Sequence, residues 1–158
     1  MAMTMTGEVV LPADRSIVWA ALNDPEVLKR CIPGCEELQK ISETEFQARA
    51  KVAVGPVKAT FNGRVQLSDI DPPNGYTIAG EGQGGVAGFA KGGAKVRLEE
   101  VEAGTRMTYD VEATVGGKLA QLGGRLINGT AKKYADTFFA NFARLVAPTE
   151  AGASPENA

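Results

Sequence analysis

The sequence predicts an α+β domain in which a curved antiparallel sheet of about seven strands wraps round a long C-terminal helix, with two short helices after the first strand. From Glu36 to Val115 apolar and polar residues alternate with a period of two, which is typical of strands with one buried face. The alternation is clean, which indicates an antiparallel sheet with one face in water and one face buried. From Lys118 to Val146 the apolar residues recur every three or four positions, which indicates an amphipathic helix.

Composition favours one folded domain, residues 1–146, and excludes several classes of site. The chain has 158 residues, 44% of them hydrophobic, and its net charge of −2 gives no electrostatic basis for binding nucleic acid. The sequence contains no histidine, which removes the usual general base and the commonest metal ligand. Cys31 and Cys35 lack the two further ligands of a zinc site, so we expect reduced, partly buried thiols and no metal.

Neither end of the sequence has the pattern of a targeting or membrane-spanning segment. Residues 1–16 lack the basic and apolar regions of a signal peptide, and no window approaches about 18 consecutive apolar residues. Residues 147–158 are small, polar and punctuated by proline, which predicts a disordered tail. The sequence therefore predicts a cytoplasmic protein.

The first elements are a strand and two short helices. Residues 4–11 alternate modestly and predict the strand. Asp14 is placed to cap a helix over residues 16–22, and Pro25 is placed at the first position of a second helix, which ends before residues 32–34.

The following strands form hairpins whose inward side chains are small. Turns are predicted at Gly55-Pro56, at residues 71–75 and at Ala103-Gly104. A curved sheet with small inward residues, spanned by one helix, tends to leave an apolar cavity. The alternative is that the inward aromatic side chains fill this space; these are Phe61, Tyr76, Tyr109, Tyr134 and Phe138. The small inward residues are Ala48, Ala50, Ala59, Gly63, Gly80, Ala94 and Ala113.

The C-terminal helix is predicted to run unbroken over residues 118–146, although Gly123, Gly124 and Gly129 interrupt its first half. Each glycine costs about 1 kcal/mol relative to alanine in a helix interior. Such a cost indicates a close approach of the sheet backbone, with ligand contact as the alternative. The predicted apolar face comprises Leu119, Leu122, Leu126, Ala131, Tyr134, Ala135, Phe138, Phe142 and Leu145.

The glycine-rich residues 80–93 resemble a phosphate-binding loop only superficially, because a strand follows them and no Gly-Lys-Ser/Thr ending is present. We expect a mobile hairpin, or a lid at the cavity mouth formed by Gly84, Gly85, Val86 and an exposed Phe89. The predicted cavity would hold a lipophilic small molecule. Its lining is predicted as Leu28, Ile32, Ala50, Val52, Ala59, Phe61, Gly63, Tyr76, Ile78, Ala94, Val96, Met107, Tyr109, Val111, Leu122, Gly123, Leu126, Ile127, Tyr134 and Phe138.

The order of elements resembles the helix-grip fold of START domains, birch-pollen-allergen-like proteins and polyketide cyclases (the SRPBCC superfamily). Within that superfamily, residues 5–145 resemble the CoxG family of carbon monoxide dehydrogenase subunits. The motifs that carry this resemblance are Asp24-Pro25-Glu26, Cys31-Ile32-Pro33-Gly34-Cys35-Glu36, Val54-Gly55-Pro56-Val57, Asp71-Pro72-Pro73, the glycines of residues 80–88, and the segment from Gly117 to Ile127.

The resemblance implies an accessory protein of a carbon monoxide dehydrogenase-type molybdenum hydroxylase, without the cofactors of the catalytic subunits. The family is associated with recruitment of the enzyme to the cytoplasmic membrane. Some relatives carry a long C-terminal extension suited to anchoring, whereas this chain ends in a short polar tail, so we expect peripheral contact with the inner membrane.

Three functions follow from these observations. In the first, the cavity carries an isoprenoid quinone or a lipid between a membrane and the enzyme. In the second, the protein is a ligand-free assembly, maturation or recruitment factor. The third is a cyclase or dehydratase, for which Tyr76, Tyr109 and Tyr134 are the inward candidates and Glu81 stands at the rim. Tyrosines with an ordinary pKa near 10 are poor bases at neutral pH.

Overall fold

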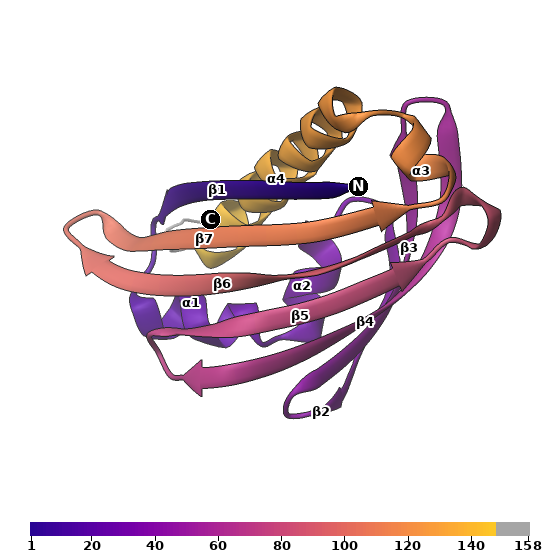
Figure 1. Ribbon diagram of the computed structural model, residues 1–158. Coiled ribbons are helices and arrows are strands. Elements are labelled where there is room, and N and C mark those ends of the chain that lie inside the picture. Colours follow the sequence, from indigo (N-terminus) through magenta and orange to yellow (C-terminus); the bar gives the residue numbers. More distant parts are fainter. Residues whose placement is uncertain (148–158) are drawn as a thin grey trace.

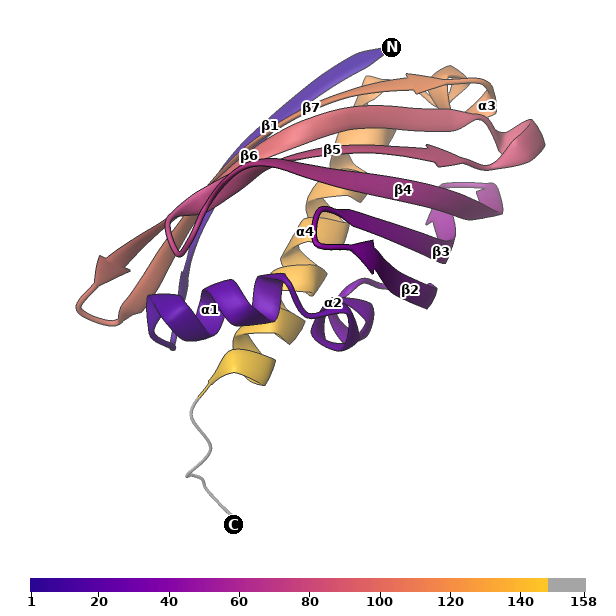
Figure 2. The same cartoon turned by 90° about the horizontal axis from the view of Figure 1, so that it is seen from below.

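In the computed structural model, which describes residues 1–147, seven antiparallel strands curl around a long helix (Figures 1 and 2). The strand order is β1-β7-β6-β5-β4-β3-β2, and the predicted helix-grip fold is confirmed. Residues 148–158, most of the predicted tail, lie outside the described part of the chain. The elements are β1 (Ala2–Leu11), α1 (Arg15–Leu22), α2 (Pro25–Cys31), β2 (Cys35–Ser42), β3 (Glu45–Val54), β4 (Val57–Asp71), β5 (Gly75–Gln83), the short 3₁₀ helix η1 (Gly85–Ala87), β6 (Phe89–Val101), β7 (Gly104–Gly116), α3 (Lys118–Gln121) and α4 (Gly124–Val146).

The register of the sheet places small inward residues opposite one another. Ala48 pairs with Gly63, and Gly80 of β5 pairs with Gly92 of β6. Residues 80–93 form a hairpin, as predicted, and most of the glycine-rich segment is strand, because β5 continues to Gln83 and β6 begins at Phe89. At Gly92 a Cβ would collide with the backbone oxygen of Glu112 in β7, so only glycine allows these strands to pair so closely.

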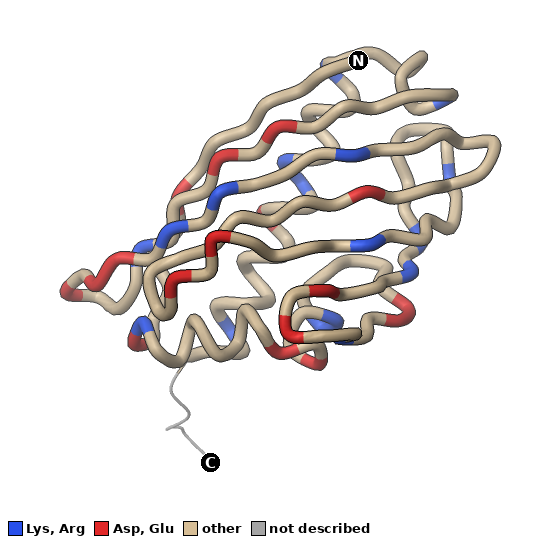
Figure 3. Tube along the Cα trace, turned by 60° about the horizontal axis from the view of Figure 1, so that its bottom comes forward, with Lys and Arg blue, Asp and Glu red and all other residues tan. Residues whose placement is uncertain are grey.

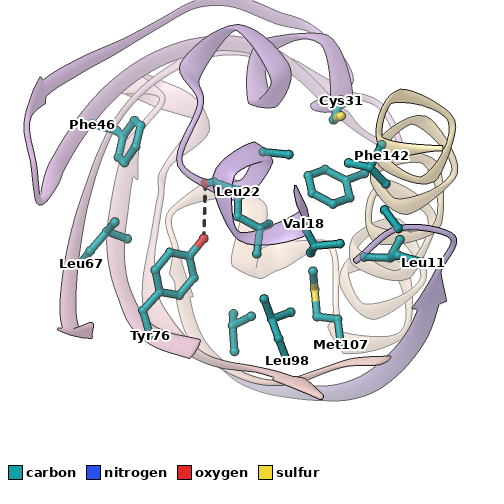
Figure 4. Close-up of a cluster of buried hydrophobic side chains, with 14 residues drawn as sticks. Leu11, Val18, Leu22, Cys31, Phe46, Leu67, Tyr76, Leu98, Met107 and Phe142 are labelled. Atoms are coloured by element: carbon teal, nitrogen blue, oxygen red, sulfur yellow. Dashed lines mark hydrogen bonds between the residues drawn. The ribbon is translucent and has the colours of Figure 1, made fainter. Parts of the chain in front are cut away.

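Helix α4 crosses the concave face of the sheet, and α1 and α2 close one end of that face (Figure 2). The largest group of buried apolar side chains lies where these three helices meet the sheet (Figure 4). Of the two predicted helix starts, only that of α2 has a side-chain N-cap hydrogen bond. The Asp24 carboxylate accepts a hydrogen bond from the Glu26 backbone N–H at 2.9 Å, whereas Asp14 occupies the cap position of α1 without a side-chain bond.

The prediction of one unbroken helix over residues 118–146 is wrong. The chain forms α3, turns at Leu122 and Gly123, and starts again as α4. Gly123 has a φ of +90°, a conformation that a residue with a Cβ rarely adopts. The expected close approach at the three glycines is also wrong, because a Cβ at Gly123, Gly124 or Gly129 would meet no atom within 4 Å.

The inward face of α4 differs from the predicted face at several positions. Phe139 packs against the core, whereas Leu126 and Leu145 are exposed. Ile127 and Phe142 are both buried beneath the sheet, and Ile127 was not placed on the predicted face.

No helix within residues 1–147 combines the length and the apolar character needed to cross a bilayer.

Candidate functional site

A first cavity of about 340 Å³ lies between the concave face of the sheet and the middle of α4. Helices α1 and α2 and the residue after α2 contribute its far wall through Leu22, Leu28 and Ile32. The remaining lining residues are Met5, Leu38, Phe46, Val65, Leu67, Tyr76, Ile78, Ala94, Val96, Met107, Tyr109, Val111, Ala135, Phe138 and Phe139.

A second cavity of about 330 Å³ lies beside the N-terminal half of α4, toward the end of the sheet that carries η1. It is lined by Met3, Val52, Val54, Phe61, Gly82, Ala90, Ala113, Val115, Leu119, Ile127, Thr130, Ala131 and Tyr134. Each cavity falls within the range of about 300–1,000 Å³ that is usual for small-molecule sites.

The two cavities follow one another along α4, and the residues between them are small. Ala131 lines the second cavity and Ala135, one helical turn later, lines the first. On the sheet, the inward positions at this level are Gly63, Gly80 and Gly92, which have no side chain to form a partition. This arrangement suits a ligand long enough to extend from one cavity toward the other.

The described lining of both cavities contains no Asp, Glu, Lys or Arg, and its polar atoms are mostly tyrosine hydroxyls. The Tyr76 hydroxyl donates to the Leu22 carbonyl at 3.5 Å (Figure 4). The Tyr109 ring stacks on Phe139 with centroids 5.1 Å apart. Burial raises the pKa of Tyr76 and of Tyr109, so both stay protonated at neutral pH and cannot act as bases there.

The buried hydroxyl of Tyr76 should make the fold sensitive to alkaline pH. Because the pKa of Tyr76 is raised in the folded state, the unfolded chain loses its proton first, above about pH 10. Stability is therefore full below that pH and falls as the pH rises above it. Tyr76→Phe should flatten this fall between about pH 10 and 11, as measured by urea unfolding at a series of pH values. If the free energy of unfolding fell equally with pH in the wild type and in Tyr76→Phe, the buried Tyr76 hydroxyl would not be the cause of the fall.

The structure places fourteen of the twenty predicted cavity residues in the two cavities and six outside them. Ten line the first cavity and four line the second. Leu122 and Leu126 instead line a groove on the outer side of α4, and Gly123 is exposed at the α3–α4 break. Ala50, Ala59 and Gly63 face inward in the sheet register without lining either cavity. Ligand contact by any of these residues stays a prediction. The first cavity holds Leu28, Ile32, Tyr76, Ile78, Ala94, Val96, Met107, Tyr109, Val111 and Phe138, and the second holds Val52, Phe61, Ile127 and Tyr134.

Several lining residues were not predicted from the sequence. Met3 and Met5 lie opposite Ala113 and Val111 in the register of β1 with β7, a pairing that the strand pattern of β1 alone does not reveal. Phe139 was missed because its position in the helical repeat falls beside the predicted apolar face, not within it.

The predicted lid is a tight turn beside the second cavity. Phe61 packs beneath Gly84, where a Cβ would lie 2.5 Å from the ring. Phe89 is not exposed as predicted, because its ring lies over Gly116. Val86 is the residue that projects, with 86% of its surface exposed.

Comparisons with known proteins agree with this architecture. Residues 7–147 match the model of the CoxG family, which is described as a subunit of carbon monoxide dehydrogenase. A search of curated protein sequences finds no significant match.

Among solved structures, a conserved protein from Geobacillus kaustophilus is similar, with a TM-score of 0.85 and 31% identity over 91% of this chain and 95% of that one. An aromatase/cyclase from Streptomyces sp. R1128 has a TM-score of 0.68 at 14% identity, covering 92% of this chain and 94% of its own. Ara h 8.0201 has a TM-score of 0.66 at 15% identity, covering 92% of this chain and 98% of its own. The last two share the fold alone.

Proposed function

The chain belongs to the CoxG family of carbon monoxide dehydrogenase subunits, and on that premise we propose that it is a non-catalytic accessory protein that carries a lipophilic ligand for a carbon monoxide dehydrogenase-type molybdenum hydroxylase. The observation that carries this proposal is the pair of uncharged apolar cavities along α4. The ligand would be an isoprenoid quinone or a lipid, and the protein would act at the cytoplasmic face of the inner membrane through peripheral contact.

The chemistry of the cavities supports binding of such a ligand. Burial of a hydrocarbon chain contributes about 0.8 kcal/mol per CH₂ group, so a prenyl or acyl chain supplies affinity without charged contacts. A quinone would also fit the proposed partner, because an enzyme that oxidises a small gas must pass its electrons to an acceptor. A carrier brings a poorly soluble acceptor to that enzyme.

The alternative of a cyclase or dehydratase has little support in the lining of the cavities. Acid–base catalysis needs a group whose pKa lies near the working pH. Tyr76 and Tyr109 have raised pKa values, and Glu81 lies on the outer face, where its neighbour in the register is Lys91. The fold shared with an aromatase/cyclase does not supply the missing groups.

Native mass spectrometry of the protein purified from its own host tests the proposal. We expect a mass above that of the bare chain, and organic extraction should release a stoichiometric isoprenoid quinone or lipid. A bare mass, together with failure to take up added ubiquinone, menaquinone or phospholipid, would contradict the carrier function. The ligand-free assembly, maturation or recruitment factor would then be favoured.

A further inference from the structure

The turns of the sheet gather at two ends that differ in chemistry. Because neighbouring strands are antiparallel, the β3–β4 turn, η1 and the α3–α4 junction share one end, which we call the loop tip (residues 54–57, 84–88 and 117–126). Contacts hold these segments together. Gly117 lies against Gly88, and the Leu126 side chain lies beside Gly55. The loop tip is therefore one surface built from segments distant in the sequence.

Aliphatic side chains project from the loop tip. Val86 is 86% exposed, the most of any large hydrophobic residue in the described part of the chain. Leu126 is 38% exposed and Leu122 is half-buried. Val86 stands on a turn fixed by Gly85 and Gly88, whose φ angles of +61° and +114° favour glycine. The fold thus holds an apolar side chain out toward solvent at this end.

The charged residues of the loop tip are Lys118 and Arg125, and its three segments contain no Asp or Glu. The segments that form the loop tip belong to three stretches, residues 46–68, 82–98 and 113–135, that contain Lys and Arg but no Asp or Glu. Farther from the tip, Arg49, Lys51, Arg64 and Lys132 of these stretches pair with carboxylates of β2, β3 and α4. Lys118, Arg125 and Lys133 are exposed and make no ion pair with any residue of 1–147. The loop tip is consequently positive although the chain has a net charge of −2.

The opposite end of the sheet carries the acidic residues. Glu43 and Glu102 lie in the β2–β3 and β6–β7 turns, and Asp71 ends β4 (Figure 3). The basic side chains of Lys40, Arg15 and Arg106 at this end pair with Glu43, Glu100 and Glu99. Exposed aliphatic residues occur there too, but Ile70 stands between Asp69 and Asp71. The two ends therefore differ in their charged residues, whereas both have exposed aliphatic side chains.

The loop tip also borders the second cavity. The groove on the outer side of α4 is lined by Leu122, Leu126, Thr130 and Lys133 among others, and Thr130 also lines the second cavity. Beside it, the Tyr134 hydroxyl accepts a hydrogen bond from the Ala53 backbone N–H at 3.1 Å. The groove and the second cavity therefore meet at Thr130.

From these observations we propose that the loop tip docks on an anionic lipid bilayer, with Val86 and Leu126 entering the interface and Lys118 and Arg125 on the headgroups. Lys133, two turns farther along α4, would add to this charge. Exposed apolar groups together with basic residues suit this partner, because burial and attraction to anionic lipid act together. The inference rests on the proposed function, since a carrier must meet the phase in which its ligand dissolves. The groove would give the ligand its route to the second cavity.

Cosedimentation of the full chain with vesicles tests the docking surface. We expect binding to vesicles of phosphatidylglycerol and phosphatidylcholine, little binding to phosphatidylcholine alone, and weakening as salt increases. The double variant Lys118→Gln/Arg125→Gln should lower the partition coefficient about tenfold, and Val86→Gln should lower it several-fold.

Matched substitutions elsewhere provide the controls. Lys29→Gln/Arg30→Gln removes the same charge from exposed positions of α2, and Ile70→Gln removes an exposed aliphatic group at the acidic end. Both controls should bind the vesicles as the wild type does. Equal losses in controls and loop-tip variants would overturn the assignment of this surface.

The outcome for the surface is separable from the outcome for the carrier function. A wild-type protein that carries a bound lipophile but ignores anionic vesicles would overturn the docking proposal alone. Vesicle binding that depends on the loop tip, by a protein that holds no ligand, would support the surface and contradict the carrier. Loss of partner-enzyme binding in the loop-tip variants, without vesicle binding by the wild type, would overturn the bilayer as partner and assign the surface to a protein instead.

Discussion

Replacing Phe142 by Ala should lower the free energy of unfolding by about 3–5 kcal/mol, because removal of a buried aromatic ring leaves a cavity that the surroundings fill only in part. Phe142 is 0% exposed and lies in the cluster where α4 meets α1, α2 and the sheet. Its ring stacks on Phe138 with centroids 5.7 Å apart, so the substitution also removes an aromatic pair. Urea unfolding followed by circular dichroism measures the change.

Leu145→Ala is the matched control for this prediction. Leu145 lies in the last turn of the same helix, but it is 40% exposed and is not part of the buried cluster. We expect a loss below about 1 kcal/mol, since little surface changes its contact with water. Similar losses for the two variants would show that the C-terminal half of α4 contributes through helix formation rather than through packing at Phe142.

The strands were predictable from the sequence because the side-chain period of a strand is fixed. Once Phe46, Ala48 and Ala50 are assigned to one face, every second residue follows, and the hairpin turns then set which strands are neighbours. The short helices were predictable for a similar local reason. Asp24 and Pro25 specify the start of α2 within two residues of sequence.

The inward face of α4 was less predictable, because the rotation of a helix about its axis depends on what it packs against. Successive residues are about 100° apart around the helix, so a small error in the predicted rotation changes which side chains face the sheet. The prediction included Leu126 and Leu145, which are exposed, and left out Phe139, which packs on the core. The helical pattern predicts that Gly123-Gly124 lies within a helix, whereas Gly123 takes a φ of +90° and separates two helices. Its conformation depends on where α3 must end beside η1, which is a tertiary effect.

The cavities were predictable in kind but not in number. Small inward residues on the strands indicated unfilled space, and the structure contains it. The division into two cavities arises from where α4 places Ala131, Tyr134 and Ala135 against the sheet, which no local pattern determines.

Ala94→Phe and Ala113→Phe should each reduce the fraction of protein that retains a bound lipophile by about tenfold or more, because a phenyl ring then occupies space that the ligand needs. Ala94 lines the first cavity and Ala113 lines the second. If the ligand is a long chain that extends over Gly63, Gly80 and Gly92, both substitutions exclude it. A compact ligand would be lost from one variant only, and that variant identifies its cavity.

The control for both variants is Ala79→Phe, which adds the same ring on the exposed outer face of β5, next in sequence to the inward Ile78. Overpacking a core costs about 1–3 kcal/mol, so thermal unfolding must show that each variant is folded before its ligand content is compared. Native mass spectrometry with added menaquinone or phospholipid then gives the bound fraction. Folded Ala94→Phe and Ala113→Phe proteins that take up as much ligand as Ala79→Phe would place the ligand outside both cavities, and the carrier function would lose its structural basis.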